Sequence, residues 1–247
     1  YAKNALKAVL KTQSNRYPTH RFACSQFAGE WLFGKAAHFE VVYNAIDLDR
    51  FRFNAEARAQ ARADLGLVGN QFAIGHVGRF TAQKNHAFLI DVFAEVAKRR
   101  DDAVLLLVGT GEAGASVKAL VDERGLTDRV KFLGQRSDVN RLYQAFDAFV
   151  LPSLYEGLGL VGVEAQVSGL PCLLSDAITR EVDVTGECKF LSIDSPVVWA
   201  DEICSLSKKS DEGRDSTSPG SFVHYDIGQQ ADWLLRRYLQ LINGDRN

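Results

Sequence analysis

Residues 148–164 read AFVLPSLYEGLGLVGVE, which is an apolar run, a glycine-rich turn and a second apolar segment. The pattern predicts a strand at Ala148–Leu151 and a helix that begins near Leu158 and ends at Gly169. The free N–H groups and the positive dipole end of that helix would face the chain in front of Gly157. A helix terminus of this kind is suited to bind phosphate.

Two glutamates flank the turn. Glu156 lies at its mouth, and Glu164 follows about two helical turns later, at a rise of about 1.5 Å per residue. This separation is too large for both carboxylates to hold one small ion, but they could bind separate hydroxyl groups of an extended ligand. The alternative is a capped, solvent-facing helix with two ordinary glutamates.

Apolar runs and helical patterns alternate along the middle of the chain. Five short, nearly continuous apolar runs are typical of strands covered on both faces: Phe72–Val77, Val104–Val108, Val130–Leu133, Ala148–Leu151 and Pro171–Leu174. The segments between them have helical patterns: Ala87–Lys98, Ser116–Arg124, Asp138–Phe146 and Leu158–Ser168. The alternation predicts an α/β fold with a doubly wound, Rossmann-like parallel sheet. Ligands bind such sheets beyond the carboxyl ends of the strands.

The first 43 residues are organised differently. They carry a helical pattern, followed by two short strands around a helix: Arg21–Cys24, Gln26–Phe33 and Phe39–Val42. Two such strands do not form a stable sheet by themselves, so we interpret residues 1–43 as the remnant of a second domain. The main domain is assigned to residues 44–226, beginning with a polar hinge at Asn44–Phe51. Residues 227–247 form an amphipathic C-terminal helix.

A second cluster lies at residues 75–85, which read GHVGRFTAQKN. Arg79 directly follows a predicted strand, and Lys84 lies where the next helix begins. A cation at a helix N-terminus is unfavourable unless an anion is bound there too. Two cations beside glycines that permit close backbone approach suit a diphosphate. The alternative is that both are solvated surface cations.

The two clusters belong to different strand–helix units, but a parallel sheet brings both loops to one edge. Together they describe a ligand with a charged middle and hydroxylated ends, which is the chemistry of a nucleotide diphosphate sugar. A neighbouring motif leaves an alternative open. Residues 109–114 read GTGEAG and fit the dinucleotide fingerprint of an NAD-dependent oxidoreductase. That motif requires an acid at the end of the next strand, whereas Asp128 precedes the strand and Gln135-Arg136 follow it.

Composition excludes several other functions. The 247 residues carry a formal charge of −2, which argues against general affinity for nucleic acid. The four cysteines lack C-x-x-C spacing and indicate reduced thiols in a cytoplasmic protein, without a disulfide framework or metal site. No apolar run approaches the roughly 18 residues that span a bilayer. The basic residues Lys98–Arg100 are interpreted as a solvated helix end, with a peripheral membrane contact as the alternative.

The combination of motifs resembles the retaining glycosyltransferases of family 4, which have the two-domain GT-B fold. The resemblance covers about residues 22–242, with four motifs in order: Gly78-Arg79-Phe80 with Lys84, residues 107–112, residues 150–157, and the pair Glu156 and Glu164. Asn44-Ala45-Ile46-Asp47 resembles the interdomain hinge, although the family usually has glycine at Ala45. Residues 178–182 also resemble bacterial enzymes that build capsular or exopolysaccharide chains.

The resemblance implies a role for each matched residue. Arg79 and Lys84 would bind the donor diphosphate and stabilise the charge on the leaving group, while Glu156 would contact sugar hydroxyls at the reacting carbon; these three are the candidate catalytic residues. Seven further residues complete the donor site: Gly78, Gly109, Gly111, Arg136 in the base-binding loop, Gly157 and Leu158 through backbone N–H groups, and Glu164 on the ribose. The resemblance implies that no metal and no other cofactor is needed, because protein cations replace the metal.

The resemblance also implies that donor and acceptor are bound by different domains. Residues 1–43 would end an acceptor-binding N-terminal domain that is otherwise missing, and the C-terminal helix would cross back to it. We expect a cytoplasmic enzyme, in contact at most with the inner face of the membrane, that transfers a sugar from a UDP-linked donor to a glycan or lipid-linked acceptor. Residues 1–247 alone would bind the donor without efficient transfer. A non-catalytic nucleotide-sugar-binding module is the further alternative, but it would have lost cationic or acidic partners that are all present here.

Overall fold

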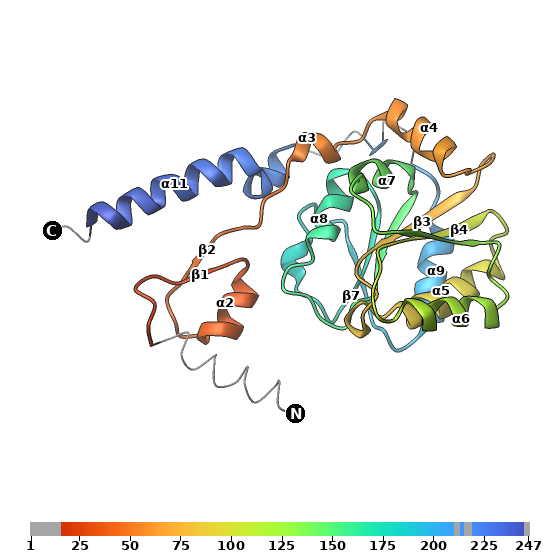
Figure 1. The fold of residues 1–247 in the computed structure, drawn as a ribbon, viewed down its shortest axis with the longest axis horizontal. Coiled ribbons are helices and arrows are strands. Elements are labelled where there is room, and N and C mark those ends of the chain that lie inside the picture. Colours follow the sequence, from red (N-terminus) through yellow and green to blue (C-terminus); the bar gives the residue numbers. More distant parts are fainter. Residues whose placement is uncertain (1–15, 210–212, 215–218, 245–247) are drawn as a thin grey trace. The chain divides into compact units, whose positions relative to one another are not determined.

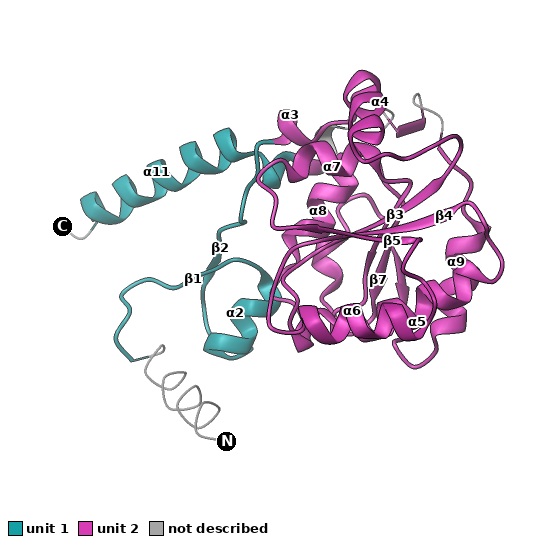
Figure 2. Cartoon of the chain, turned by 45° about the vertical axis from the view of Figure 1, so that its right-hand side comes forward, with its two compact units in different colours: residues 1–47, 223–247 teal, residues 48–222 magenta. Residues whose placement is uncertain are grey.

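A computed structural model of the chain describes residues 16–209, 213–214 and 219–244. The chain forms two compact units, one of residues 1–47 and 223–247 and the other of Leu48–Phe222 (Figure 2). The domain boundaries drawn from the sequence, after residues 43 and 226, stay predictions. The assignment of the two units to acceptor-side and donor-side domains also stays a prediction. The helical pattern at the start of the chain lies largely outside the described residues.

The larger unit is built on a parallel six-stranded sheet in the order β5-β4-β3-β6-β7-β8. Its strands are β3 Phe72–Val77, β4 Ala103–Val108, β5 Val130–Gly134, β6 Ala148–Leu151, β7 Cys172–Ser175 and β8 Lys189–Leu191. The strand order reverses between β3 and β6, because the chain runs outward from β3 on one side and from β6 on the other. Ligands bind α/β sheets at such a switch point, so the loops after β3 and β6 border the position where a site is expected.

Helices cover both faces of this sheet (Figures 1 and 2). One face carries α5 His86–Ala97, α6 Gly114–Glu123 and α9 Pro196–Ser205. The other carries α3 Leu48–Phe51, α4 Ala55–Asp64, α7 Val139–Ala145 and α8 Leu160–Val167. Short 3-10 turns lie at Ala82–Lys84, Arg180–Val182 and Pro219–Tyr225. The predicted α/β fold with a doubly wound parallel sheet is confirmed.

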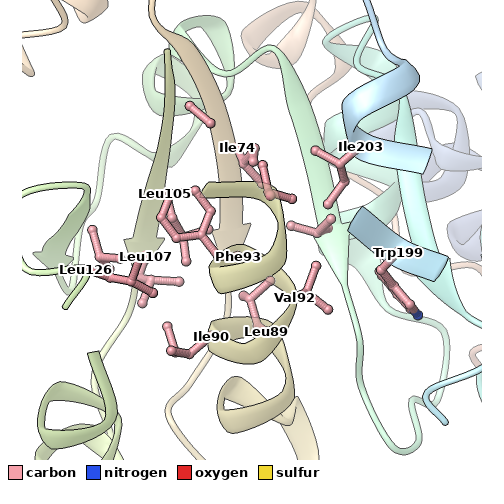
Figure 3. Close-up of a cluster of buried hydrophobic side chains, with 14 of the residues drawn as sticks. Ile74, Leu89, Ile90, Val92, Phe93, Leu105, Leu107, Leu126, Trp199 and Ile203 are labelled. Carbon is pink, nitrogen blue, oxygen red and sulfur yellow. The ribbon is translucent and has the colours of Figure 1, made fainter. Parts of the chain in front are cut away.

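The core beneath α5 shows why β3 and β4 read as continuous apolar runs. Side chains of both strands are buried against one face of α5 and against α9 (Figure 3). Trp199 of α9 is fully buried, and its indole N–H donates to the carbonyl of Ser192 at 2.8 Å. Fully burying a large apolar side chain stabilises a fold by about 1.5–3 kcal/mol, so this layer holds the sheet that positions the loops.

Among the described residues of the larger unit, four helices and strands are absent from the sequence prediction: α3, α4, β8 and α9. The sequence of α4 is rich in alanine and charge and has no apolar stripe, but Arg58 and Arg62 both form ion pairs with the buried carboxylate of Asp147, at 2.5 and 3.1 Å. The hinge predicted at residues 44–51 contains the short helix α3. Its first residue, Leu48, is buried.

The basic residues at the end of α5 are paired with acids. Lys98 bonds to Glu95 at 2.6 Å, and Arg99 pairs with Asp201. Arg100 contacts Asp102 at 2.9 Å and lies 3.7 Å from the ring centre of Phe72. The pairs of Lys98 and Arg99 are exposed to solvent and are weak, so the choice between a solvated helix end and a membrane contact stays a prediction.

The smaller unit contains the two predicted strands, shortened to β1 Phe22–Ala23 and β2 Glu40–Val41, which pair in parallel around α2 Gln26–Phe33. The hydroxyl of Ser25 caps α2 by accepting from the N–H of Ala28 at 3.0 Å. The predicted C-terminal helix is α11, Ile227–Gly244. It is tied to β2 by the guanidinium of Arg237, which donates to both carboxylate oxygens of Glu40.

Candidate functional site

Glycines let the loop after β4 lie directly against the loop after β3. Gly109 has φ +133°, and a Cβ there would lie 2.1 Å from the carbonyl oxygen of Gly78. A Cβ on Gly111 would lie 2.3 Å from the carbonyl oxygen of Phe80. Any larger residue would push the two loops apart. The structure thus gives Gly109 and Gly111 a packing role, while their contact with a donor stays a prediction.

Lys84 closes the 3-10 turn at Ala82–Lys84, just ahead of α5. Asn85 follows in the left-handed conformation, with φ 53° and ψ 45°, and α5 begins at His86. Asparagine adopts this conformation more readily than most residues. The turn sets Lys84 before the helix N-terminus, close to the predicted position. Gly78 packs beside it, since a Cβ there would lie 3.1 Å from Cδ and Cε of Lys84.

Glu156 meets Lys84 directly. The Nζ atom of Lys84 lies 2.6 Å from Oε1 of Glu156, and these side chains are only 14% and 9% exposed. One belongs to the loop after β3 and the other to the loop after β6, 72 residues later. In a parallel sheet these two loops are expected to converge at one edge. They do converge, and the result is a largely buried pair of opposite charges at the switch point.

Arg79 has a different environment. Its side chain is 77% exposed, and its Nε lies 4.0 Å from Oε2 of Glu112, which is the outer limit of an ion pair. It lines a pocket of about 440 Å³ together with Gly109, Thr110, Gly111 and Gln135. An exposed pair at this distance contributes little and is easily exchanged. The guanidinium can therefore turn toward an anion in the pocket at small cost.

Arg136 does not line that pocket. Its guanidinium forms two hydrogen bonds to Asp138, both at 2.7 Å. The contact with Asp138 raises the pKa of Arg136, and the hydrogen bond from Arg136 lowers the pKa of Asp138. Arg136 borders a separate small pocket of about 150 Å³ with Asp64, Asp138 and Arg141. The neighbouring Gln135 faces the larger pocket instead.

Glu164 is half-buried on α8 and is not a solvent-facing glutamate. Its Oε2 accepts a hydrogen bond from the hydroxyl of Tyr143 at 2.8 Å. Burial raises the pKa of Glu164, and the bond from Tyr143 acts in the opposite direction. Tyr143 is fully buried beneath it, and burial raises the pKa of this phenol well above 10.0. A partly desolvated carboxyl group with one neutral donor has the capacity to accept further hydroxyl groups.

The helix that follows Glu156 begins later than predicted. It starts at Leu160 and not near Leu158, because Gly159 takes a left-handed conformation with φ 79° and ψ 54°. The N–H groups of Gly157 and Leu158 therefore belong to the loop. The side chain of Leu158 is buried, and a Cβ on Gly157 would meet no described atom within 4 Å. Packing within the described residues thus leaves the space around Gly157 open.

Two histidines lie in the interior beside Lys84. His76 is a hydrogen-bonded core residue, as predicted, with Nδ1 2.8 Å from the carbonyl oxygen of Val150. The ring of His86 meets it edge-on at 4.7 Å between centres. Neither nitrogen of His86, nor Nε2 of His76, has a hydrogen-bond partner in the described part of the chain. Burial, followed by the charge of Lys84, lowers the pKa of His86 to about 4.

A sequence model of the family Glycosyl transferases group 1 matches residues 71–209. The chain belongs to this family. The matched region runs from β3 to just beyond α9 and includes Arg79, Lys84, Glu156 and Glu164. Membership favours the glycosyltransferase interpretation of the glycine-rich loop at residues 109–114 over the NAD-dependent alternative.

Relatives in bacteria support the same membership. EpsF of Bacillus subtilis is 36% identical over 232 residues, which are 91% of this chain and 60% of EpsF. The UDP-Gal:alpha-D-GlcNAc-diphosphoundecaprenol alpha-1,3-galactosyltransferase of Escherichia coli is 37% identical over 143 residues, which are 55% of this chain and 36% of that enzyme. The chain therefore spans at most about three fifths of these relatives.

Solved structures show the same fold. The crystal structure of Anabaena HepE in complex with UDP and glucose matches with a TM-score of 0.81 at 23% identity, over 95% of this chain and 66% of that one. Sucrose-phosphate synthase from Thermosynechococcus elongatus matches with a TM-score of 0.79 at 23% identity, over 98% of this chain and 62% of that one. The six-stranded sheet corresponds to the C-terminal Rossmann-like domain of GT-B glycosyltransferases.

Three polar residues of the candidate site were not predicted from the sequence. Gln83, Gln135 and Tyr143 are absent from the predicted set, although Gln135 lines the pocket and Tyr143 supports Glu164. The position of Gln83 directly before Lys84 is a signal that could have pointed to it. Gln135 lies in the predicted base-binding loop, but nothing in the sequence separates it from Arg136.

The described residues contain neither a candidate metal-binding cluster nor a candidate membrane-spanning helix. No group of three or more histidine, cysteine, aspartate or glutamate side chains there is placed to hold a metal ion. Within the same residues, no helix combines the length and apolar character needed to cross a membrane. All four cysteines are free thiols. The expectation that this protein works without a metal stays a prediction.

Proposed function

We propose that this chain is the donor-binding part of a retaining glycosyltransferase that transfers a sugar from a UDP-sugar to a glycan or lipid-linked acceptor in surface polysaccharide synthesis. The observation that carries the proposal is the contact of 2.6 Å between Lys84 and Glu156. It joins a diphosphate-binding cation and a hydroxyl-binding carboxylate at the switch point of the sheet. The two groups would bind adjacent parts of one donor.

The charged side chains of the candidate site match the charges that develop as the bond between the sugar and the diphosphate breaks. When the bond between the sugar and the diphosphate breaks, negative charge grows on the leaving phosphate while the sugar becomes positive. Arg79 and Lys84 would stabilise the phosphate by charge attraction, which is stronger for the largely buried Lys84 than for the exposed Arg79. Glu156 would bind sugar hydroxyls next to the reacting carbon, and Glu164 would bind the ribose. No step in this account requires a metal.

Two comparisons support uridine as the base. Anabaena HepE was crystallised with UDP and glucose, and the Escherichia coli relative is named for UDP-galactose. The same relative is named for an acceptor linked to diphosphoundecaprenol, which supports a lipid-linked acceptor here. An enzyme with such substrates would act in the cytoplasm, at the inner face of the membrane.

The smaller unit would contribute to the acceptor side. Residues 1–43 would complete an acceptor-binding domain, to which α11 would cross back. Several large apolar side chains of α11 are at least half exposed in the described structure, namely Ile227, Leu235, Leu239 and Ile242. We therefore expect residues 1–247 alone to bind the donor but to transfer sugar slowly.

A thermal-shift titration with UDP, GDP and ADP and their glucose conjugates tests the proposal. Ligands that bind the folded state raise the Tm, by an amount set by concentration over Kd. The uridine compounds should raise it, and Arg79→Ala should abolish the rise. Arg124→Ala is the matched control, because Arg124 is also an exposed arginine paired with an acid, Asp91 at 2.8 Å. No shift with any nucleotide, or an equal loss in both variants, would contradict the proposal.

A further inference from the structure

Gln83 connects the two loops of the candidate site. Its side-chain Nε2 donates to the carbonyl oxygen of Tyr155 at 2.9 Å and to Oε2 of Glu156 at 3.3 Å. The main-chain carbonyl of Gln83 accepts a hydrogen bond from the N–H of Leu154 at 2.8 Å. One residue of the loop after β3 is therefore bonded to three consecutive residues of the loop after β6.

The amide of Gln83 can take only one orientation here. The carbonyl of Tyr155 and the carboxylate of Glu156 are both acceptors, so the NH₂ group must face them. Its two hydrogens match these two acceptors. The two hydrogen bonds therefore keep the Gln83 amide from flipping. They also restrict the rotation of the Glu156 carboxylate, which accepts one of them.

Gln83 and Lys84 each bind a different oxygen of the Glu156 carboxylate. Lys84 binds Oε1 at 2.6 Å, and Gln83 binds Oε2. Both residues belong to the short 3-10 turn at Ala82–Lys84, so their relative position is set by one rigid segment. The turn thus fixes both the place and the rotation of the carboxylate before any ligand arrives, which lowers the entropic cost of binding.

We propose that Gln83 is a positioning residue that orients Glu156, and that this orientation lets the site prefer a nucleotide sugar over the bare nucleotide. The inference rests on the proposed function, because it assigns Glu156 to the sugar of the donor. Gln83 acts through a hydrogen bond to a charged partner, which is a stronger kind of bond than one between two neutral groups. The expected change in affinity on its loss is about tenfold or more.

The backbone geometry separates this role from simple loop packing. The bond from the Leu154 N–H goes to the main-chain carbonyl of Gln83, so side-chain variants keep it. The ion pair between Lys84 and Glu156 also remains. A variant at Gln83 therefore loses the orientation of the carboxylate while the two loops stay joined.

Isothermal titration calorimetry of UDP and of a panel of UDP-sugars provides the test. Two variants are compared with wild type: Gln83→Leu, which keeps the volume, and Gln83→Ala. Both should bind UDP with a Kd within about twofold of wild type, and should lose about tenfold in affinity for the UDP-sugar that wild type most prefers over UDP. Gln26→Ala is the control, because Gln26 also donates to a glutamate, Glu30 at 2.9 Å. It should match wild type for every ligand.

A double-mutant cycle completes the experiment. In the Glu156→Gln background, Gln83→Leu should have no further effect on the preference for the sugar, because the residue acts through that carboxylate. Equal losses for UDP and UDP-sugar, an unchanged preference, or an undiminished effect in the Glu156→Gln background would each overturn the inference. So would a wild type that binds UDP but prefers no UDP-sugar over it. A wild type that binds neither would contradict the proposed function itself.

Discussion

Two ion pairs among the predicted site residues differ in how they are built. The pair of Lys84 and Glu156 joins loops that are 72 residues apart, and its side chains are 14% and 9% exposed. The pair of Arg136 and Asp138 lies within one loop, and its side chains are 39% and 30% exposed. A local, exposed pair forms in almost any fold and contributes little. A buried pair between distant segments requires the fold to desolvate both charges, so it indicates a site more strongly.

The largest expected effect comes from breaking the buried pair. Lys84→Ala leaves the Glu156 carboxylate without its cation, and removing one partner of a buried pair costs about 3–5 kcal/mol, with the lower end expected here because some solvent reaches both groups. Urea denaturation of the variant should show this loss of unfolding free energy. Replacing both residues, with Lys84→Met and Glu156→Leu, should recover much of the stability. A single variant as stable as wild type would show that the pair is not desolvated.

A pH titration of stability tests the interior next to Lys84. Unfolded histidine binds a proton below about pH 6.5, whereas His86 in the folded protein resists protonation until about pH 4. The unfolded state therefore binds more protons in this window, and stability falls as the pH falls. The contribution of His86 to this loss should reach about 3 kcal/mol between pH 6.5 and 4, measured by denaturation at each pH, and the buried His76 adds to it because burial also lowers its pKa. His86→Leu should flatten this part of the profile, and an equally steep profile would refute the assignment.

A smaller effect is expected at the acid on α8. Tyr143→Phe removes the hydroxyl that donates to Glu164 and leaves the carboxyl group half-buried with fewer donors. The variant should lose about 1–2 kcal/mol of stability, and the pKa of Glu164 should rise further because the bond that opposed the effect of burial is gone. NMR titration of the Glu164 carboxyl carbon measures the second change. A downward shift of that pKa would contradict the expected electrostatics.

The smallest effect is expected at the exposed pair. Arg136→Ala should change the free energy of unfolding by less than about 1 kcal/mol, because solvent screens its bond to Asp138. Its effect on the affinity for UDP should be smaller than that of Arg79→Ala, since Arg136 does not line the pocket that contains Arg79. Titration calorimetry with UDP compares the two. A larger loss of UDP affinity for Arg136→Ala than for Arg79→Ala would indicate that Arg136 contacts the nucleotide.

The sequence predicted the inner part of the molecule well for a physical reason. Strands buried on both faces must be continuously apolar, so β3 to β7 are visible in the sequence, and the parallel sheet then requires the loops of Lys84 and Glu156 to converge. The outer elements give weaker signals. The strand β8 has three residues and begins with an exposed lysine, and α4 is held by charges that meet Asp147 only after folding.

The individual polar contacts of the site could not be predicted. Whether Arg136 or Gln135 faces the pocket depends on the rotation of one loop, and the carboxylate of Asp138, two residues after Arg136, captures the guanidinium. The start of α8 depends on the left-handed conformation of Gly159, which the run of glycines allowed but did not require. Sequence patterns indicate which segments are buried and whether their apolar residues repeat with the spacing of a helix or of a strand. They do not report which of two adjacent side chains turns inward.

The placement of the tryptophans gives each unit its own fluorescent reporter. Trp199 is fully buried in the larger unit, whereas Trp31 and Trp233 of the smaller unit are 56% and 38% exposed. An indole shielded from water emits at shorter wavelength than a hydrated one. Melting of the sheet should therefore shift the blue part of the emission spectrum to the red, while loosening of α2 or α11 should change only the red part. Spectroscopy of the unmodified chain can then follow each unit separately.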